Sequence, residues 1–243
     1  MNIWPKNKNN ISNQGVTIVE LSISLAIIGL LISLVVLGYN LYHGAEIRKT
    51  ISEITDLNSA IDEFTKQYNY LPGDLPTATN YWGTFSKNIN NDGVYNGDGD
   101  SYINNDEDLY SFKHLSRAGL IFGNFSSVKY NSEERFKSGI NAPKSTIFVD
   151  GLYRFYDITN PVNNNSGHVI QLGAADSTGL PNNPVIKAKD IYAIDQKIDD
   201  GIPTTGLVSG VNGNNSSCLD SNLNYNFSLD QKNCILLYWH KKF

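Results

Sequence analysis

The sequence predicts an α+β fold, in which one long N-terminal helix packs on a small antiparallel β-sheet head. Three observations support this prediction. An uncharged apolar run lies near the start of the chain, and a helical-period apolar stripe follows it directly. The rest of the chain contains short apolar segments separated by Asn, Gly and Pro. We therefore expect a helix over residues 16–68 and a globular domain over 69–243.

The apolar run is long enough to cross a membrane. No Asp, Glu, Lys, Arg or His occurs in the 22 residues from Leu21 to Tyr42, and about 20 apolar residues span a bilayer core. We predict an anchor over about residues 16–42. Glu20 stands at its start, and a charge at the centre of the hydrocarbon costs roughly 2.5–3.5 kcal/mol, so a carboxylate at the membrane indicates a functional residue. Lys6 and Lys8 precede it and favour a cytoplasmic N-terminal flank.

Two ordinary explanations compete for this segment. A secretory signal peptide also combines a basic start with an apolar stretch, but its apolar region has about 7–15 residues and ends in an A-x-A-like site. The run here is longer, and no such site follows it. A plain single-pass anchor is the second alternative.

The segment from Gly15 to Glu20 resembles the signal of type IV prepilins and type II secretion pseudopilins. That signal is a short basic leader ending in Gly, then a hydrophobic residue, with Glu fifth in the mature chain. The resemblance implies a leader at residues 1–15, cleaved between Gly15 and Val16 by a prepilin peptidase on the cytoplasmic side. It also implies N-methylation of Val16 and a role for Glu20 in assembly. Val16 stands where the family usually has Phe.

The resemblance further implies a place and partners for the chain. The precursor would be a single-pass protein of a bacterial inner membrane, with its globular domain in the periplasm. It would join other pilin or pseudopilin subunits in a pilus or pseudopilus, through an inner-membrane assembly platform. The sequence does not distinguish a secretion pseudopilus, a retractable pilus and a DNA-uptake filament. One alternative function is a membrane-anchored, calcium-stabilised adhesin or binding module that does not polymerise. The other is an anchored periplasmic enzyme, for which a pocket with clustered polar groups would argue.

The helix is expected to continue beyond the anchor as an amphipathic helix. Apolar residues recur at spacings of three and four, which places them on one helical face. They are Ile47, Ile51, Ile54, Leu57, Ile61, Phe64 and Tyr68. We expect this stripe to pack on the sheet; a coiled coil with another chain is the alternative, but the stripe covers only about three heptads. Pro72 and Pro76 end the helix.

An acidic loop, residues 96–107, has the spacing of an EF-hand calcium loop. Such loops place oxygen ligands at alternate positions and close the set with Glu at the twelfth. Counted from the first position, the predicted ligands are Asn96, Asp98, Asp100, the Tyr102 carbonyl, Asn104 and Glu107. Asn replaces the first Asp, and Ser101 replaces the turn Gly. The sequence predicts a calcium site here, and the resemblance is in keeping with it, because major pseudopilins bind calcium in their globular domain. The alternative is a solvated turn without metal.

The remaining elements are predicted from short patterns. We expect a helix over 109–121 capped by Gly119, a hairpin of 145–149 with 152–156, a strand over 168–173, a helix over 184–198 and a last strand over 234–239. The stretches 77–103 and 201–218 read as loops. Asp195, Asp199 and Asp200 admit two interpretations: a cation or subunit-contact site, or a helix end followed by a turn.

The two cysteines, Cys218 and Cys234, are predicted to form a disulfide. An exported domain meets an oxidising compartment, and closing a loop of this length contributes about 3 kcal/mol in the chain-entropy model. Two free thiols or part of a metal site are the alternatives.

Charge and motifs restrict the remaining function classes. The net charge is −5, and loss of the two leader lysines would leave −7, which argues against nucleic acid as a partner. The chain contains no G-x-S-x-G, P-loop, H-E-x-x-H or G-x-G-x-x-G motif, so nothing in the sequence indicates an enzyme.

Overall fold

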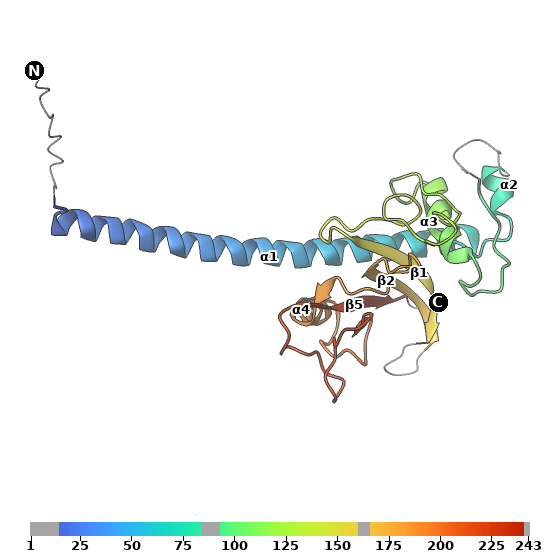
Figure 1. Ribbon diagram of the computed structural model, residues 1–243. Coiled ribbons are helices and arrows are strands. Elements are labelled where there is room, and N and C mark those ends of the chain that lie inside the picture. The colour runs from blue at the N-terminus through green and yellow to red at the C-terminus, as the bar shows by residue number, and fades with distance from the viewer. Residues whose placement is uncertain (1–14, 84–92, 160–165, 241–243) are drawn as a thin grey trace, which may run out of the picture. The chain divides into compact units, whose positions relative to one another are not determined.

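The computed structural model describes residues 15–83, 93–159 and 166–240 (Figure 1). The elements are α1 (Ile18–Tyr68), α2 (Ala78–Trp82), α3 (Glu107–Arg117), β1 (Gly151–Thr159), β2 (Ser166–Ala174), β3 (Ile186–Lys187), α4 (Ala188–Ile198), β4 (Val208–Asn212) and β5 (Lys232–Trp239). The chain divides into two compact units, Met1–Ala45 and Glu46–Phe243. The predicted α+β class is confirmed: a long N-terminal helix is followed by a small antiparallel sheet with further helices.

The first unit contains the N-terminal part of α1. Helix α1 is the one described helix that is long and apolar enough to cross a membrane. Large apolar side chains point outward all around it, and those of Leu21, Leu30 and Leu37 each expose more than half of their surface. Such a surface is unfavourable in water, and the helix is compatible with a single membrane anchor.

In the second unit, the C-terminal part of α1 buries the predicted stripe. Five of its members are buried, namely Ile47, Ile54, Leu57, Ile61 and Phe64, and Ile51 and Tyr68 are partly buried against the same core. This hydrophobic core also contains Phe155, Ile170 and Leu236 of the sheet. The helix therefore packs within the chain, as predicted, and its polar face remains outside.

The sheet has five antiparallel strands, with β2 and β5 at its centre. Its order is β1-β2-β5-β3, and β4 also pairs with β5. Side chains alternate between the two faces. Ile170 and Leu236 join the core that includes α1, whereas Val169 and Leu237 join a smaller cluster with Val211. The predicted strands over 168–173 and 234–239 are confirmed within β2 and β5.

The predicted hairpin of 145–149 with 152–156 is confirmed in its second strand, which lies within β1, and is wrong in its first strand and in the pairing. Strand β1 pairs with β2 along its whole length, from Gly151 opposite Ala174 to Thr159 opposite Ser166. Residues 145–149 form no strand: the N–H of Ser145 donates to the Gly151 carbonyl at 3.0 Å, but the donors that follow it have acceptors outside β1. The N–H groups of Ile147 and Phe148 each donate to Ser145 Oγ at 3.2 Å.

Four other boundaries differ from the prediction. The stretch 77–103 contains the short helix α2, and the stretch 201–218 contains β4. The helix predicted over 184–198 begins at Ala188, because the preceding residues form β3. Helix α3 begins at Glu107 and ends at Arg117, and Gly119 follows with φ of 75°. The N–H of Leu120 donates to the Leu115 carbonyl at 3.0 Å, which completes the predicted glycine cap.

The predicted disulfide is confirmed. Cys218 and Cys234 are joined, both are fully buried, and their Cα atoms are 4.7 Å apart. The bond ties the segment after β4 to β5.

An aromatic cluster fixes α2 against the end of α1. The ring centroid of Trp82 lies 5.4 Å from that of Tyr68 and 6.2 Å from that of Phe64. The ring centroid of His114, in α3, lies 5.7 Å from that of Trp82. These contacts hold α2, whose Thr79 N–H donates to Asn96 of the acidic loop at 2.8 Å.

Candidate functional site

The first candidate site is the start of α1. Thr17 precedes the helix, and Glu20 lies in its first turn. The Glu20 carboxylate accepts from the Thr17 N–H at 2.9 Å and from the Thr17 hydroxyl at 2.8 Å, while the Glu20 N–H donates to Thr17 Oγ1 at 3.2 Å. This reciprocal pattern is a capping box, which satisfies N–H groups that a helix start leaves without partners. Glu20 therefore has a local structural role that the sequence analysis missed, although T-x-x-E before an apolar run is its signal.

The predicted cleavage point lies immediately before this cap. Gly15 has open space around its Cα, and the side chain of Val16 is about three-quarters exposed, at 74 %. No regular secondary structure includes residues 15–17. The bond between Gly15 and Val16 is therefore exposed and lies outside the helix. The rest of the predicted leader, residues 1–14, lies outside the described residues.

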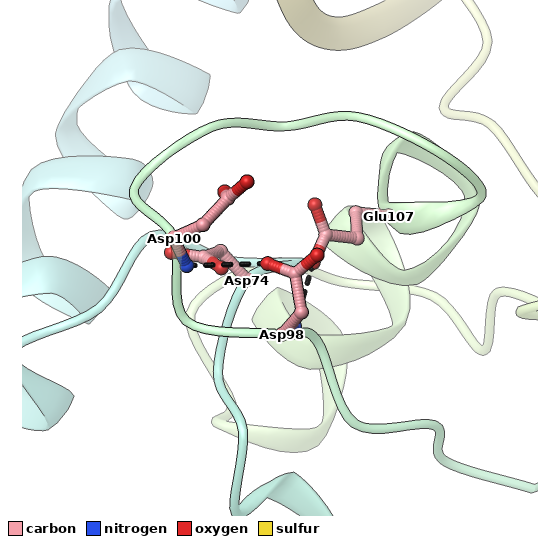
Figure 2. A group of neighbouring side chains, drawn as sticks. All are labelled: Asp74, Asp98, Asp100 and Glu107. Atoms are coloured by element: carbon pink, nitrogen blue, oxygen red, sulfur yellow. Dashed lines mark hydrogen bonds between the residues drawn. The ribbon is translucent and has the colours of Figure 1, made fainter.

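The second candidate site is a cluster of four carboxylates. It is formed by Asp74, Asp98, Asp100 and Glu107 (Figure 2), and an oxygen from each lies within 4.8 Å of the others. Three of them were predicted as ligands, and the fourth, Asp74, comes from the turn after α1. Asp74 and Glu107 are buried, whereas Asp98 and Asp100 are exposed. The acidic loop thus closes over the turn.

Backbone N–H groups hold the two buried carboxylates. Asp74 accepts from Gly99 at 2.6 Å and from Ser101 at 3.0 Å. Glu107 accepts from the N–H of Asp98 at 2.9 Å and from that of Asn104 at 3.0 Å. These bonds hold the Asp74 and Glu107 carboxylates against the backbone of the acidic loop.

The electrostatics of the cluster reflect crowding of like charges. Burial, together with the charges of the neighbouring Asp98 and Asp74, raises the pKa of Glu107 to about 7, although the hydrogen bonds from the backbone N–H groups act in the opposite direction. Burial also raises the pKa of Asp74, with Asp100 and Asp98 acting in the same direction. In the part of the chain that the structure describes, none of the four carboxylates forms an ion pair. Ionised together, they repel one another.

The other predicted ligands have different positions. The Asn96 side-chain oxygen accepts from the Thr79 N–H at 2.8 Å, and thereby caps α2. The N–H of Tyr102 donates to Asp100 at 2.8 Å. Asn104 donates from its amide to Asp100 at 2.9 Å, and its side-chain oxygen is buried without a hydrogen-bond partner among the described residues. Ser101, which replaces the turn Gly, has φ of 69°, so the backbone adopts the left-handed conformation at that position.

Two nearby acids belong to a separate network. Asp106 pairs with Arg135 at 2.7 Å, and Asp108 pairs with Arg135 and with Arg154, the latter at 2.8 Å. These acids therefore have cations of their own, unlike the four clustered carboxylates.

The donor set fits a hard divalent cation. Calcium takes six to eight oxygen ligands, including carboxylates and amide carbonyls. The cluster offers four carboxylates, and Asn104 offers a buried amide oxygen that lacks a donor among the described residues. No sulfur or imidazole ligand belongs to the group. Bound calcium would supply positive charge to Asp74, Asp98, Asp100 and Glu107.

The acids at the end of α4 are held by their own loop. The fully buried Asp195 accepts from the Tyr225 hydroxyl at 2.6 Å and from the Gly201 N–H at 3.1 Å. Asp199 accepts from the N–H groups of Leu207 and Val208. These bonds are those of a helix end followed by a turn, but carboxylate oxygens of Asp195, Asp199 and Asp200 also lie within 4.8 Å of one another, so the interpretation as a cation site remains open.

These two acids also interact with each other. Burial, together with the adjacent Asp199, raises the pKa of Asp195 to about 8. Burial acts to raise the pKa of Asp199, but hydrogen bonds from Asp195 and from backbone N–H groups outweigh it and lower that pKa. Asp195 is therefore the member of the pair that carries a proton at neutral pH.

Comparisons with known proteins do not assign the chain to a family. No family model, no curated protein and no solved structure matches it. The function must therefore be argued from the chain's own residues.

Proposed function

We propose that the chain is a pilin-like subunit, a pseudopilin or minor pilin, which assembles into a type IV pilus or type II secretion pseudopilus. The observation that carries the proposal is the position of Glu20. It stands just before the uncharged apolar run of α1, five residues after an accessible glycine. The outward-facing apolar surface of α1 also supports it, because that surface needs lipid before assembly and neighbouring helices after it.

The mechanism follows from the cost of a carboxylate in hydrocarbon. Cleavage between Gly15 and Val16 by a prepilin peptidase creates a new amine on Val16, which is then N-methylated and remains cationic. Glu20 of an incoming subunit pairs with the Val16 ammonium of a neighbour, which offsets the desolvation of both charges. Before assembly, the bonds from Thr17 partly satisfy the carboxylate.

Three variants separate the charge of Glu20 from its capping role. Glu20→Gln keeps a residue type that serves in capping boxes but removes the charge. Thr17→Ala removes the cap but keeps the charge, and Glu20→Ala removes both. The proposal requires that Glu20→Gln and Glu20→Ala abolish filaments and that Thr17→Ala retains them. Filaments are measured by electron microscopy of sheared cells.

Cleavage and insertion are measured alongside filament formation. Mass spectrometry of the mature N-terminus should find Val16 as first residue in all three variants, and alkaline extraction should leave each in the membrane. Normal filaments from Glu20→Gln would contradict the ion-pair mechanism. An uncleaved Met1 in the wild-type membrane protein would contradict the processing step.

We also propose that calcium stabilises the globular domain through the carboxylate cluster. In the wild type, calcium should raise the melting temperature relative to a chelator, since it relieves the repulsion within the cluster. Asp74→Asn should remove most of this shift. Glu133→Gln is the matched control, because Glu133 is exposed and outside the cluster. An identical melt of the wild type with and without chelator would remove the metal from the proposal.

The cluster also favours one alternative function. A membrane-anchored, calcium-stabilised adhesin or binding module would show the calcium-dependent melt but would keep Met1 and form no filaments. The N-terminal mass and the melt therefore distinguish the two functions without knowledge of a binding target.

A further inference from the structure

The imidazole of His114, in α3, uses both of its nitrogens inside the second unit. The residue is fully buried. The Gly73 N–H donates to Nδ1 at 2.9 Å, and Nε2 lies 2.8 Å from the Tyr95 carbonyl oxygen. Because a carbonyl oxygen only accepts, Nε2 carries the proton and the ring is a single neutral tautomer. Burial, against the effect of the bond to Tyr95, lowers the pKa of His114 to about 4, which keeps the ring neutral at neutral pH.

Both bonds of this imidazole lie next to the carboxylate cluster. Gly73 immediately precedes Asp74, and Tyr95 immediately precedes the acidic loop. The loop then returns to the turn after α1. The N–H of Gly97 donates to the Leu75 carbonyl at 3.0 Å, and a Cβ atom on Gly97 would lie 2.4 Å from Asp74 Cα. One side chain therefore ties together the two segments that meet at Asp74.

Helix α3 provides a fixed base for this imidazole. His114 follows Glu107 by seven residues, about two helical turns, so the two side chains lie on one face of the helix. The turn after α1 packs closely on the same helix, because a Cβ atom on Gly73 would lie 2.5 Å from the Glu107 carbonyl oxygen and 2.8 Å from Ser111 Oγ. The imidazole also stacks on the ring of Phe64, with centroids 6.0 Å apart and 13° between the planes. The ring is thus held in one orientation by the core and by the helix that carries it.

We propose that His114 is a positioning residue of the cation site. Through its bond to Gly73 it sets where the Asp74 carboxylate lies among the other three carboxylates, and thereby sets the affinity for calcium. Both ring nitrogens are engaged, so the imidazole is not itself a ligand. Residues that orient metal ligands contribute roughly 10- to 100-fold to affinity. The inference deepens the proposed stabilisation by calcium and rests on it.

A residue that only filled space among aromatic rings would behave differently. The surroundings of His114 also include Trp82 and Tyr110, whose ring centroids lie 5.7 and 6.4 Å from that of the imidazole. For a space-filling role, every substitution that removed the ring would have the same consequence. A positioning residue depends instead on the bond that Gly73 donates, so a substitute that accepts this bond should retain the affinity.

Two amide variants separate these roles. Both lose the ring, but the Asn side-chain oxygen can accept from Gly73 in place of Nδ1, whereas the Gln side-chain nitrogen can donate to Tyr95 in place of Nε2. His114→Gln should therefore raise the Kd for calcium by roughly tenfold, and His114→Asn by less than about threefold. Isothermal titration of calcium chloride into the purified full-length chain in detergent measures both.

Ile194→Val is the matched control for lost stability. Ile194 is fully buried in α4, which packs on β3, β4 and β5. Loss of one methylene lowers the melting temperature without removing a bond to the turn or the acidic loop. The Kd for calcium of this variant should equal that of the wild type.

Combined variants test whether the effect passes through Asp74. In the Asp74→Asn background, His114→Gln should change the Kd little, because the carboxylate that it positions is already lost. In the Asp98→Asn background, the roughly tenfold loss should recur. Equal losses in the two backgrounds would overturn the route through Gly73.

Hydrogen exchange of the wild type tests the same coupling without a substitution. If the bond from Gly73 strengthens calcium binding, calcium must strengthen that bond by the same factor. The Gly73 amide should then exchange roughly tenfold more slowly with calcium than with chelator, beyond any change in the Val185 amide, which donates to the Cys234 carbonyl at 3.0 Å. This measurement decides the inference if the His114 variants fail to fold.

The outcomes separate this inference from the proposed function. A wild-type melt that is identical with calcium and with chelator removes the calcium proposal and this inference together, and leaves the filament proposal in place. A calcium-dependent melt with equal Kd values in His114→Gln and His114→Asn overturns the positioning role alone. A Gly73 amide that exchanges as fast with calcium as with chelator does the same. Weakening by Ile194→Val as large as that by His114→Gln would assign the loss to general stability and would also overturn the inference.

Discussion

Helix α1 contains two halves that face different surroundings. In the first, from Leu21 to Tyr42, apolar side chains cover the whole circumference and remain exposed. In the second, apolar residues are confined to one stripe, and Ile54, Ile61 and Phe64 have no exposed surface at all. The distribution of polar residues around a helix therefore indicates which surroundings suit it. The first half suits apolar partners on all sides, and the second half suits a sheet on one side.

The largest expected effect distinguishes packing in the two halves. Phe64→Ala should lower the free energy of unfolding of the globular domain by about 3–5 kcal/mol, because it removes a fully buried ring from the core. Leu30→Ala, its counterpart in the exposed half, should leave that free energy unchanged. Urea unfolding in detergent, followed by tryptophan fluorescence, measures both. Equal losses in the two variants would contradict the comparison.

The next effect concerns the covalent link within the second unit. Replacing both Cys218 and Cys234 by Ala should lower the free energy of unfolding by about 3 kcal/mol, since the denatured chain regains the entropy of an open loop. Membrane insertion through the first unit should be unaffected. Alkaline extraction tests insertion and urea unfolding tests stability; loss of insertion would show that the two units depend on each other.

A pH-dependent effect is expected from the buried pair at the end of α4. The pKa of Asp195 is raised from 3.8 to about 8 in the folded state. A raised pKa means that the folded chain binds the proton more tightly than the unfolded chain does. The stability from this proton is fully present below pH 3.8 and is lost as the pH rises to about 8, by at most about 1.4 kcal/mol per pH unit.

Asp195→Asn tests this pH dependence. An amide can donate to Asp199 and accept from Tyr225, as the protonated acid does. The variant should therefore fold, and its stability should change less between about pH 6 and 8 than that of the wild type. Urea unfolding at the two pH values measures the slope. The same slope in both proteins would assign the dependence to another group.

The smallest effect is local to the start of the exposed half. Thr17→Ala removes one side of the capping box, which should cost the helix about 1 kcal/mol. Amide hydrogen exchange in the first turn of α1 should be faster, and exchange in α3 and α4 should not change. Faster exchange throughout the second unit would mean that the cap has effects beyond its own helix.

The sequence predicted elements with a strong period better than those defined by long-range pairing. Both halves of α1 were predicted because they extend over many helical turns, and β5 was predicted from a continuous apolar run. Strand β4 was missed because Val208–Asn212 is short and contains Gly210, whose close approach to Tyr225 and Cys218 requires the absence of a side chain. The pairing of β1 with β2 was also missed, since the fold of the whole chain, and not the local pattern, decides which strand lies beside β1.

The candidate site shows the same limit. The acidic loop was predicted from alternate oxygens within twelve residues, but Asp74 lies 22 residues before that loop begins at Asn96. Its approach depends on the turn after α1, where Gly73 has φ of 107° and lies against the start of α3. Local spacing contains no information about such a contact. Asn96 shows the reverse: its spacing matched a ligand, yet its oxygen caps α2.

The aromatic cluster around Trp82 gives the molecule a built-in optical signal. The sequence has three tryptophans, and removal of the leader would take away Trp4 and leave Trp82 and Trp239. Asn96 joins the acidic loop to α2, which carries Trp82, and the indole lies against Tyr68 and His114. A rearrangement of the loop therefore changes the surroundings of one indole, so that emission from Trp82 reports on the carboxylate cluster while Trp239, in the sheet, serves as an internal reference.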